Sequence, residues 1–338
     1  MSKYQTLKKF TDNIPNEDNC HVSDNMIAIS DGAGGCGVFA GDWSKYLVDK
    51  IAQRSNNSPI TSFHEFDNWV SEIWEEFYIK HEQKAKEYDG IFQTKFYQEG
   101  SCATLAVIWR TNPHSCHWMA YGDSVVFHYS KSNEIFEHSF TKLSDFSRNP
   151  YLISCKDLLQ EEGFKNGEFQ LKEDSVVFAA SDALSHYILM MYYITHQNKY
   201  KKELDDLVKN NSYDAQMVSI AQQDTEVTFE EVIARLQEVS KEEKKFEMFV
   251  KDLYQHGVLD IDDYTLAFLY RGDSLCSASS KRISQNNYYL HHLEKNKRSK
   301  SAKLRKIRKI KSNHTKKITL TKNHCKNTHR LQRILLTS

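Results

Sequence analysis

Apolar residues along this chain follow two periods, one typical of strands and one typical of helices. Short apolar or alternating runs between turn residues predict strands, and they occupy residues 18–22, 26–30, 102–110, 116–122, 124–130, 175–181 and 264–270. Apolar residues three and four positions apart predict helices, from Phe39 to Ile51, from a capping Ser62 through Phe77, and at 183–194, 199–209, 213–222, 228–240 and 242–255.

The order of these segments indicates the fold class. Most predicted strands follow one another closely enough to form hairpins, such as the runs at 18–22 and 26–30. Two helices lie between early strands, and a helical block at 183–255 precedes the last strand. Grouped helices and hairpin-connected strands favour an α+β fold over a parallel α/β sheet.

Charge divides the chain into two parts. The whole sequence is formally neutral, but residues 274–338 hold 18 Lys and Arg against one acidic residue, so the tail carries +17 and residues 1–273 carry −17. We therefore expect a domain of residues 1–273 and a basic tail, 274–338, that is a largely disordered extension. Helical spacing of Leu304, Ile307 and Ile310 leaves a basic amphipathic helix as the alternative.

Cysteine usage and hydropathy point to a compartment. The seven cysteines are scattered without a Cys-x-x-Cys pair, which argues against a disulfide scaffold and against a thiolate zinc site. The N-terminal residues lack the apolar stretch of a signal peptide, and the apolar run near 183–194 is too short to span a bilayer. We expect a cytoplasmic protein with no transmembrane segment.

A glycine-rich segment follows the strand at 26–30. Gly32, Gly34 and Gly37 form a G-x-G-x-x-G pattern that is typical of dinucleotide-binding turns. However, the next helix leads into a second helix and not into the second strand of that motif, and Asp31 would repel phosphate groups. Nucleotide binding is therefore disfavoured, and the glycines are interpreted as a tight turn.

Acidic residues stand where apolar strands end. Asp31 and Asp182 each terminate an apolar run, and Asp262 precedes one. A carboxylate at the end of a buried strand is costly to ionise unless a positive charge meets it. Several such ends that converge offer the all-oxygen ligands that Mg²⁺ or Mn²⁺ prefers, and paired ions activate water for attack on phosphorus.

An ordered series of short motifs carries a family resemblance. The series is Asn16-Glu17-Asp18, Ser30-Asp31-Gly32-x-Gly34-Gly35, Gly100-Ser101-Cys-Ala-Thr104, Gly122-Asp123-Ser124, Ala180-Ser181-Asp182-Ala-Leu184 and Asp262-Asp263-x-Thr265. It resembles the protein phosphatase 2C family of metal-dependent serine/threonine phosphatases, in wording closest to a bacterial branch. The resemblance covers about residues 10 to 271, nearly the whole acidic part.

The resemblance implies a fold and a set of roles. The fold would be a central antiparallel β-sandwich flanked by helices in four layers, αββα, with two Mg²⁺ or Mn²⁺ ions at one end. Asp31 would bridge both ions, the Gly32 carbonyl would bind one, and Asp182 and Asp262 would complete the second. Glu17 and Asp18 would be catalytic residues that hold metal-bound waters. Asp123 would lie beside a third metal position.

The implied reaction is hydrolysis of phosphoserine or phosphothreonine by a metal-activated water. Partners would be a phosphoprotein substrate and a cognate Ser/Thr kinase. By its charge, the tail is predicted to contact nucleic acid, an anionic membrane or the acidic domain.

Two departures from the family pattern support an alternative. Asn13 stands where many members have an arginine that grips the substrate phosphate, and Ala33 stands where a histidine often follows the Asp-Gly pair. An arginine binds phosphate through two parallel hydrogen bonds and an asparagine does not. The alternative to an enzyme is thus a non-catalytic, phosphatase-like binding or scaffold module.

Overall fold

We analysed a computed structural model of the chain, in which residues 2–10, 13–54, 58–209, 213–223 and 227–270 are described. By its internal contacts the chain divides into two units, Met1–Ser274 and Leu275–Ser338. The described residues end at 270, so the basic tail and its alternative amphipathic helix lie outside them, and the structural description below concerns the first unit.

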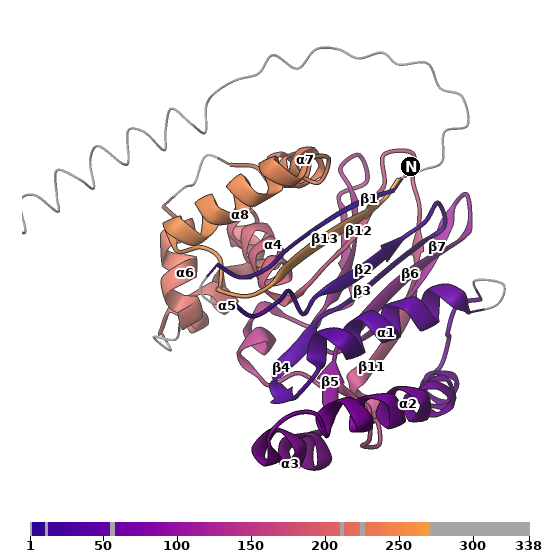
Figure 1. Ribbon diagram of the computed structural model, residues 1–338. Coiled ribbons are helices and arrows are strands. Elements are labelled where there is room, and N and C mark those ends of the chain that lie inside the picture. Colours follow the sequence, from indigo (N-terminus) through magenta and orange to yellow (C-terminus); the bar gives the residue numbers. More distant parts are fainter. Residues whose placement is uncertain (1, 11–12, 55–57, 210–212, 224–226, 271–338) are drawn as a thin grey trace, which may run out of the picture. The chain divides into compact units, whose positions relative to one another are not determined.

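Two five-stranded antiparallel sheets form the centre of this unit (Figure 1). The first sheet has the order β1-β13-β12-β8-β9 and the second β11-β7-β6-β3-β2, while a three-stranded sheet has the order β10-β5-β4. The strands are β1 (Lys3–Leu7), β2 (Asn19–Val22), β3 (Met26–Ser30), β4 (Gly32–Gly37), β5 (Ser101–Ala103), β6 (Leu105–Asn112), β7 (Ser115–Tyr121), β8 (Val125–Ser130), β9 (Ile135–His138), β10 (Ile153–Ser154), β11 (Phe164–Gln170), β12 (Val176–Ala180) and β13 (Tyr264–Leu269).

The two large sheets pack face to face because their inner rows are apolar. In β3, Ile27 and Ile29 join an apolar cluster that also contains Val177 of β12 and Ala267 of β13. The alternate β3 residues, Met26 and Ala28, face the opposite way and belong to a second cluster. This alternation follows from the period of two residues along a strand, and it leaves both faces of each central strand buried.

Helices cover the outer face of each sheet (Figure 1). Trp43 and Leu47 of α1, with Phe66 of α2, pack in the cluster on the outside of β3 and β6. Residues of α4, α7 and α8 pack in the cluster on the outside of β8, β12 and β13. The helices are α1 (Ala40–Gln53), α2 (Phe63–Ala85), α3 (Gly90–Glu99), α4 (Asp182–Thr195), α5 (Gln197–Lys209), α6 (Tyr213–Ala221), α7 (Phe229–Val239) and α8 (Glu243–His256).

The expected α+β class with a four-layer αββα sandwich is confirmed. Most predicted helices and strands have a counterpart whose ends lie within two residues, and β2 and β3 form the expected hairpin. The single strand predicted at 102–110 is wrong, since β5 and β6 divide it and lie in different sheets. The predicted tight turn at the glycines is wrong, since Gly32–Gly37 form strand β4, which pairs with β5. No helix among the described residues is both long and apolar enough to cross a membrane.

Candidate metal centre

Strand register brings the acidic strand ends together within each sheet. In the second sheet Asn19 pairs with Ser30, so Asp18 and Asp31 leave their strands side by side. In the first sheet Ala180 of β12 pairs with Val125 of β8 and with Leu266 of β13. Asp182 follows Ala180, Asp123 precedes Val125 and Asp262 precedes Leu266, each by two to four residues. Three further acids therefore follow or precede these strands at the same end of the first sheet.

Asp31 connects the two groups of acids. Its position continues the odd-numbered row of Ile27 and Ile29, which faces the other sheet. Burial raises the pKa of Asp31 well above its usual range, and the charges of Asp18, Asp182, Asp262 and Asp123 raise it further. Five carboxylates from both sheets therefore interact electrostatically at one end of the sandwich.

Asp18 has a deeply buried carboxylate in this cluster. The residue is 4% exposed, and among the described residues neither Oδ atom has a hydrogen-bond partner. Burial raises its pKa to about 7; Asp263 and Asp262 add to the effect, and Thr265 and Ser181 oppose it. Thr265 Oγ1 donates its proton to Thr6 Oγ1, whereas Ser181 Oγ accepts from Thr265 N and keeps its own proton.

Buried carboxylate oxygens without a donor are a costly arrangement unless a cation meets them. The donor set here is all oxygen, with no cysteine or histidine among the acids, and this is the chemistry of Mg²⁺ and Mn²⁺ ligands. The residues therefore fit a hard divalent cation. Among the described residues, however, no three His, Cys, Asp or Glu side chains are gathered as a ready ligand set, so the ligand assignment stays a prediction.

Asp182 and Asp123 complete the first-sheet part of the cluster. Burial raises the pKa of Asp182 well above its usual range, with contributions from Asp262, Asp123 and Asp18. Its Oδ1 accepts a hydrogen bond from Ala183 N at 2.5 Å at the start of α4. Burial raises the pKa of Asp123 to about 6. Both acids therefore hold a proton more strongly than a free aspartate does.

The adjacent acids Asp262 and Asp263 have different surroundings. Asp263 is buried, and its two oxygens accept hydrogen bonds from Lys9 N at 2.8 Å and Glu17 N at 2.6 Å. The Oδ1 atom of Asp262 accepts from Asp263 N at 2.8 Å, and burial raises the pKa of Asp262, while the charge of Lys9 lowers it. Asp263 therefore anchors the segment before β2, and Asp262 is the better candidate for a ligand.

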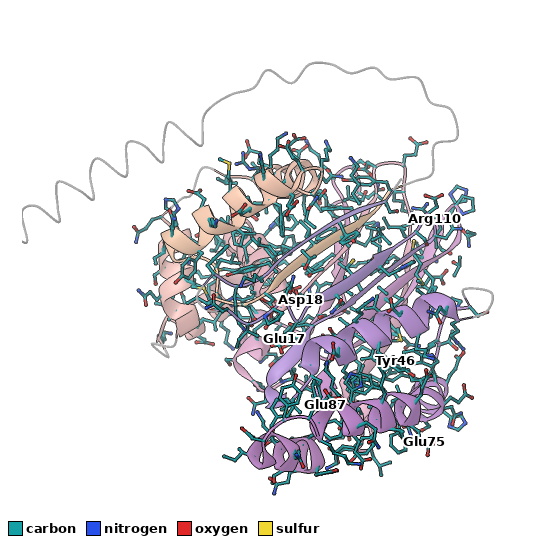
Figure 2. The ribbon with its side chains drawn as sticks, in the orientation of Figure 1. Glu17, Asp18, Tyr46, Glu75, Glu87 and Arg110 are labelled. Atoms are coloured by element: carbon teal, nitrogen blue, oxygen red, sulfur yellow. The ribbon has the colours of Figure 1, made fainter. Side chains whose placement is uncertain are left out.

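Glu17 and Asp18 stand together just before β2, at the end of the sheet remote from Arg110 (Figure 2). The Glu17 carboxylate lies directly over Gly34, where a Cβ atom would collide with Glu17 Oε2. A Cβ on Gly32 would lie 2.8 Å from the Glu17 carbonyl oxygen and from Ala40. Both glycines therefore permit a close approach of β4 to the segment that carries Glu17.

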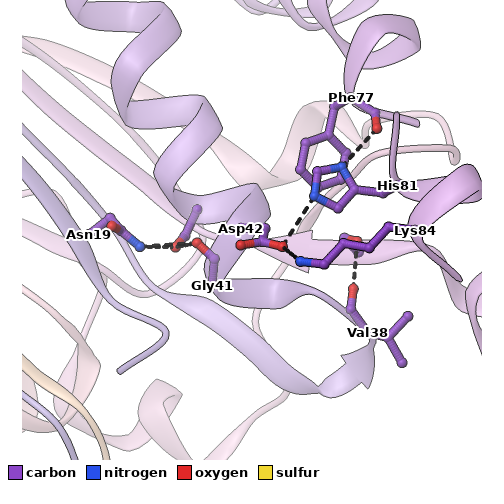
Figure 3. A network of polar contacts seen from close by, with 9 residues as sticks. Asn19, Val38, Gly41, Asp42, Phe77, His81 and Lys84 are labelled. Atoms are coloured by element: carbon purple, nitrogen blue, oxygen red, sulfur yellow. Dashed lines mark hydrogen bonds and ion pairs between the residues drawn. The ribbon is translucent and has the colours of Figure 1, made fainter. Parts of the chain in front are cut away.

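Further hydrogen bonds join this segment to α1 (Figure 3). Asn19 Nδ2 donates to Gly41 O at 3.1 Å, and Ser44 Oγ donates to Glu17 O at 2.5 Å. Asp42, next to Gly41, binds Lys84 Nζ at 2.6 Å and contacts His81 Nε2 at 3.2 Å. Burial raises the pKa of Asp42, but Lys84 and His81 lower it more, so this acid is already compensated and does not belong to the cluster.

The hydroxyl residues of the motif series hold the strand ends in place. Thr104 N donates to Asp31 O, and Thr104 Oγ1 accepts from Asp31 N and contacts Ser124 Oγ at 2.7 Å. Asn16 Nδ2 donates to Thr6 Oγ1 at 2.6 Å, and the same Thr6 oxygen accepts from Thr265. Thr6 is a positioning residue that the sequence pattern did not reveal, because it lies on the mostly polar edge strand β1.

The glycine segment does not form a nucleotide-binding turn. It runs as strand β4 beside β5, and α1 begins at Ala40, after the N-cap residue Phe39 at φ 55°. Asn13, at the position of the phosphate-gripping arginine in many family members, is exposed. The charge of Lys9 acts on Asp262, so this lysine is a cation beside the cluster.

The chain is an antiparallel β-sandwich flanked by helices, with a cluster of acids at one end. This is the architecture that the resemblance to protein phosphatase 2C implies. No protein-family model matches the sequence, and no curated protein matches it. Solved structures that are similar to the chain include bacterial serine/threonine phosphatases.

Three of these structures illustrate the likeness. PstP/Ppp of Mycobacterium tuberculosis is 13% identical with a TM-score of 0.45, covering 79% of this chain and 97% of that chain. The catalytic domain of PstP in complex with two manganese ions is 13% identical with a TM-score of 0.46, covering 79% and 96%. Stp1 from Staphylococcus aureus is 14% identical with a TM-score of 0.43, covering 79% and 93%. At such identities and TM-scores the likeness carries no conclusion about catalytic activity.

Proposed function

We propose that the protein is a Mg²⁺- or Mn²⁺-dependent serine/threonine protein phosphatase. The observation that carries the proposal is the convergence of five aspartates from both sheets at one end of the sandwich, with the Asp18 oxygens buried and without a hydrogen-bond partner among the described residues. A buried carboxylate that lacks a donor, among acids that raise one another's pKa, favours a bound divalent cation.

The ligands would be Asp31, Asp182, Asp262 and the Gly32 carbonyl oxygen, with Asp123 at a further position. A bound divalent ion supplies Lewis-acid stabilisation of phosphate charge and lowers the pKa of a coordinated water. Glu17 and Asp18 would orient water by accepting its hydrogen bonds, because both stand beside Asp31 at the start of β2. Lys9 would supply positive charge for the substrate phosphate where Asn13 does not.

Replacement of Asp182 tests the enzyme hypothesis. In the full chain, Asp182→Asn is expected to lower Mn²⁺-dependent hydrolysis of an aryl phosphate and of a phosphothreonine peptide by at least ~100-fold, since it removes a ligand charge. Asp49→Asn is the matched control, because Asp49 is an exposed acid paired with Lys45 on the surface of α1. Turnover that persists in chelator, or that survives Asp182→Asn, would contradict the proposal.

Asn13 and Ala33 favour the second candidate, a non-catalytic module that retains the fold. That protein would bind Mn²⁺ in a calorimeter without turning over any phosphopeptide. Asn13→Arg separates the two hypotheses, because an arginine restores bidentate phosphate binding. A large gain in turnover on phosphopeptides would show that only substrate capture is weakened, whereas no turnover despite metal binding would favour the module.

A further inference from the structure

Two cysteines meet across strands β4 and β5. Cys36 Sγ lies 3.6 Å from Cys102 Sγ, close enough for a thiol–thiol hydrogen bond. The ladder pairs Gly32 with Ala103 and Gly37 with Ser101, with a register shift between these pairs. The β4 residues 33–36 therefore stand opposite the single residue Cys102, in a bulge that leaves the extra residues outside the ladder pairing.

The two thiols differ in access to solvent. Cys36 is exposed, whereas Cys102 is 4% exposed. Cys102 Sγ donates to Glu99 O at 3.9 Å. Burial and the neighbouring Cys36 raise the pKa of Cys102, so its thiol stays protonated at neutral pH. A small oxidant can reach Cys36 but not Cys102, which is the arrangement of an attacking thiol and a buried resolving thiol.

We propose that Cys36 and Cys102 form a reversible disulfide when the protein meets a peroxide. The Cys36 thiolate attacks one peroxide oxygen, the O–O bond breaks, and Cys36 becomes a sulfenic acid as hydroxide leaves. The Cys102 sulfur then attacks the Cys36 sulfur, the S–O bond breaks, and the hydroxyl leaves with the Cys102 proton as water. In sum, two thiols are oxidised by two electrons and one hydrogen peroxide is reduced to two waters.

The chain around Cys36 permits the movement that this bond requires. A disulfide has an S–S length of about 2.05 Å, so the sulfur atoms must approach by about 1.5 Å from their separation of 3.6 Å. Residues 34–36 are exposed, and a Cβ on Gly35 would meet nothing within 4 Å. The segment around Gly35 and Cys36 therefore has open space for this shift, while Gly34 lies against the Glu17 carboxylate.

The same strand carries Gly32 and Gly34, so the disulfide would restrain β4 beside the proposed metal centre. That consequence rests on the proposed phosphatase function, but formation of the bond does not. The test is accordingly a chemical one, on the full chain, and it succeeds or fails whatever the protein's catalytic activity.

The experiment treats reduced full-length protein with hydrogen peroxide, alkylates the remaining thiols, and digests with trypsin without a reductant. The expected product joins the peptide of residues 10–45, which contains Cys20 and Cys36, to the peptide of residues 96–110, which contains only Cys102. Its mass should equal the summed masses of the two peptides, with Cys20 alkylated, less two hydrogen atoms, and dithiothreitol should reverse the link.

Two matched variants identify the sulfur in the longer peptide. Cys36→Ser should abolish the cross-link, and Cys20→Ser should leave it intact, although both cysteines lie in the same peptide. Cys36 is exposed, so Cys36→Ser is expected to fold normally, which circular dichroism checks. The proposal would be overturned by a cross-link that survives Cys36→Ser, by a link from Cys102 to Cys155 or to a tail cysteine, or by recovery of both thiols unlinked.

Discussion

The neighbouring acids Asp262 and Asp263 differ in the hydrogen bonds that their carboxylates accept. An asparagine at 262 can still accept the hydrogen bond from Asp263 N, whereas an asparagine at 263 has one acceptor oxygen for the two amides of Lys9 and Glu17. Leaving a buried amide without an acceptor costs about 1–3 kcal/mol.

We therefore expect Asp263→Asn to lower the free energy of unfolding by about 2 kcal/mol more than Asp262→Asn does in chelator. Urea unfolding of both variants, with the wild type as reference, measures the difference. For metal affinity the order should reverse, and calorimetry with Mn²⁺ should show the larger loss for Asp262→Asn. Equal effects of the two substitutions on both quantities would refute this division of labour.

The raised pKa of Asp18 has a consequence for stability in metal-free protein. The folded chain keeps a proton on Asp18 up to about pH 7, whereas an unfolded aspartate releases it near pH 4, at about 3.9. Stability from this group is therefore present at low pH and is lost as pH rises toward 7. Between pH 5 and pH 8 the loss amounts to roughly 3 kcal/mol.

Comparison with Asp18→Asn measures that contribution together with its coupling to Asp31 and Asp182, whose pKa the Asp18 charge raises. Burial lowers the pKa of His81, His117 and His138. The stability that these groups contribute is therefore lost in the opposite direction, as pH falls. They are common to both proteins and cancel in the difference. In chelator, the free energy of unfolding of the wild type should rise by roughly 3 kcal/mol relative to that of Asp18→Asn from pH 8 to pH 5, as measured by urea unfolding. Parallel pH profiles of the two proteins would contradict a raised pKa of Asp18.

At the scale of the element, strand β4 shows why the sequence predicted some parts of the structure and not others. The central strands are buried on both faces, so their continuous apolar runs identified them. Glycines carry no such signal, and β4 was mistaken for a turn. The edge strand β1 and strand β11 are rich in polar residues and were missed for the same reason.

The candidate site divides in the same way. Strand-end aspartates were recognisable, because each interrupts an apolar run at a fixed place. The residues that hold these aspartates in place were not recognisable. Asp263, for example, accepts hydrogen bonds from the amides of Lys9 and Glu17, which lie more than 240 residues away in the sequence. Such contacts depend on which strands pair, and local sequence periodicity does not encode pairing.

The two neighbouring glycines of β4 provide a test at this scale. A Cβ at Gly34 would collide with the Glu17 carboxylate, whereas a Cβ at Gly35 would meet nothing within 4 Å. We expect Gly34→Ala to displace Glu17 and to lower Mn²⁺-dependent turnover about 10-fold or more, with a change in unfolding free energy of about 1 kcal/mol or less because a flexible side chain yields. Gly35→Ala should match the wild type in both measurements; equal turnover of the two variants would exclude a role for the Glu17 position.

At the scale of the whole molecule, the charge asymmetry is the dominant feature. Three apolar clusters give the first unit its own cores. It carries a net charge of −17, and the remaining residues carry +17. Self-repulsion destabilises a compact acidic domain, and a covalently attached basic segment opposes that repulsion.

This opposition predicts a salt-dependent difference in melting temperature. At 50 mM salt we expect the full chain to melt roughly 2–4 °C above residues 1–273, as for a stabilisation of about 1 kcal/mol. At 500 mM salt the difference should vanish, because the Debye length falls below about 5 Å. Thermal unfolding of both proteins across this range measures it. A difference that persists at high salt would mean that the tail contacts the domain through apolar packing. No difference at any salt would mean that the tail's charge acts on an external polyanion, and a mobility shift with nucleic acid would then test this.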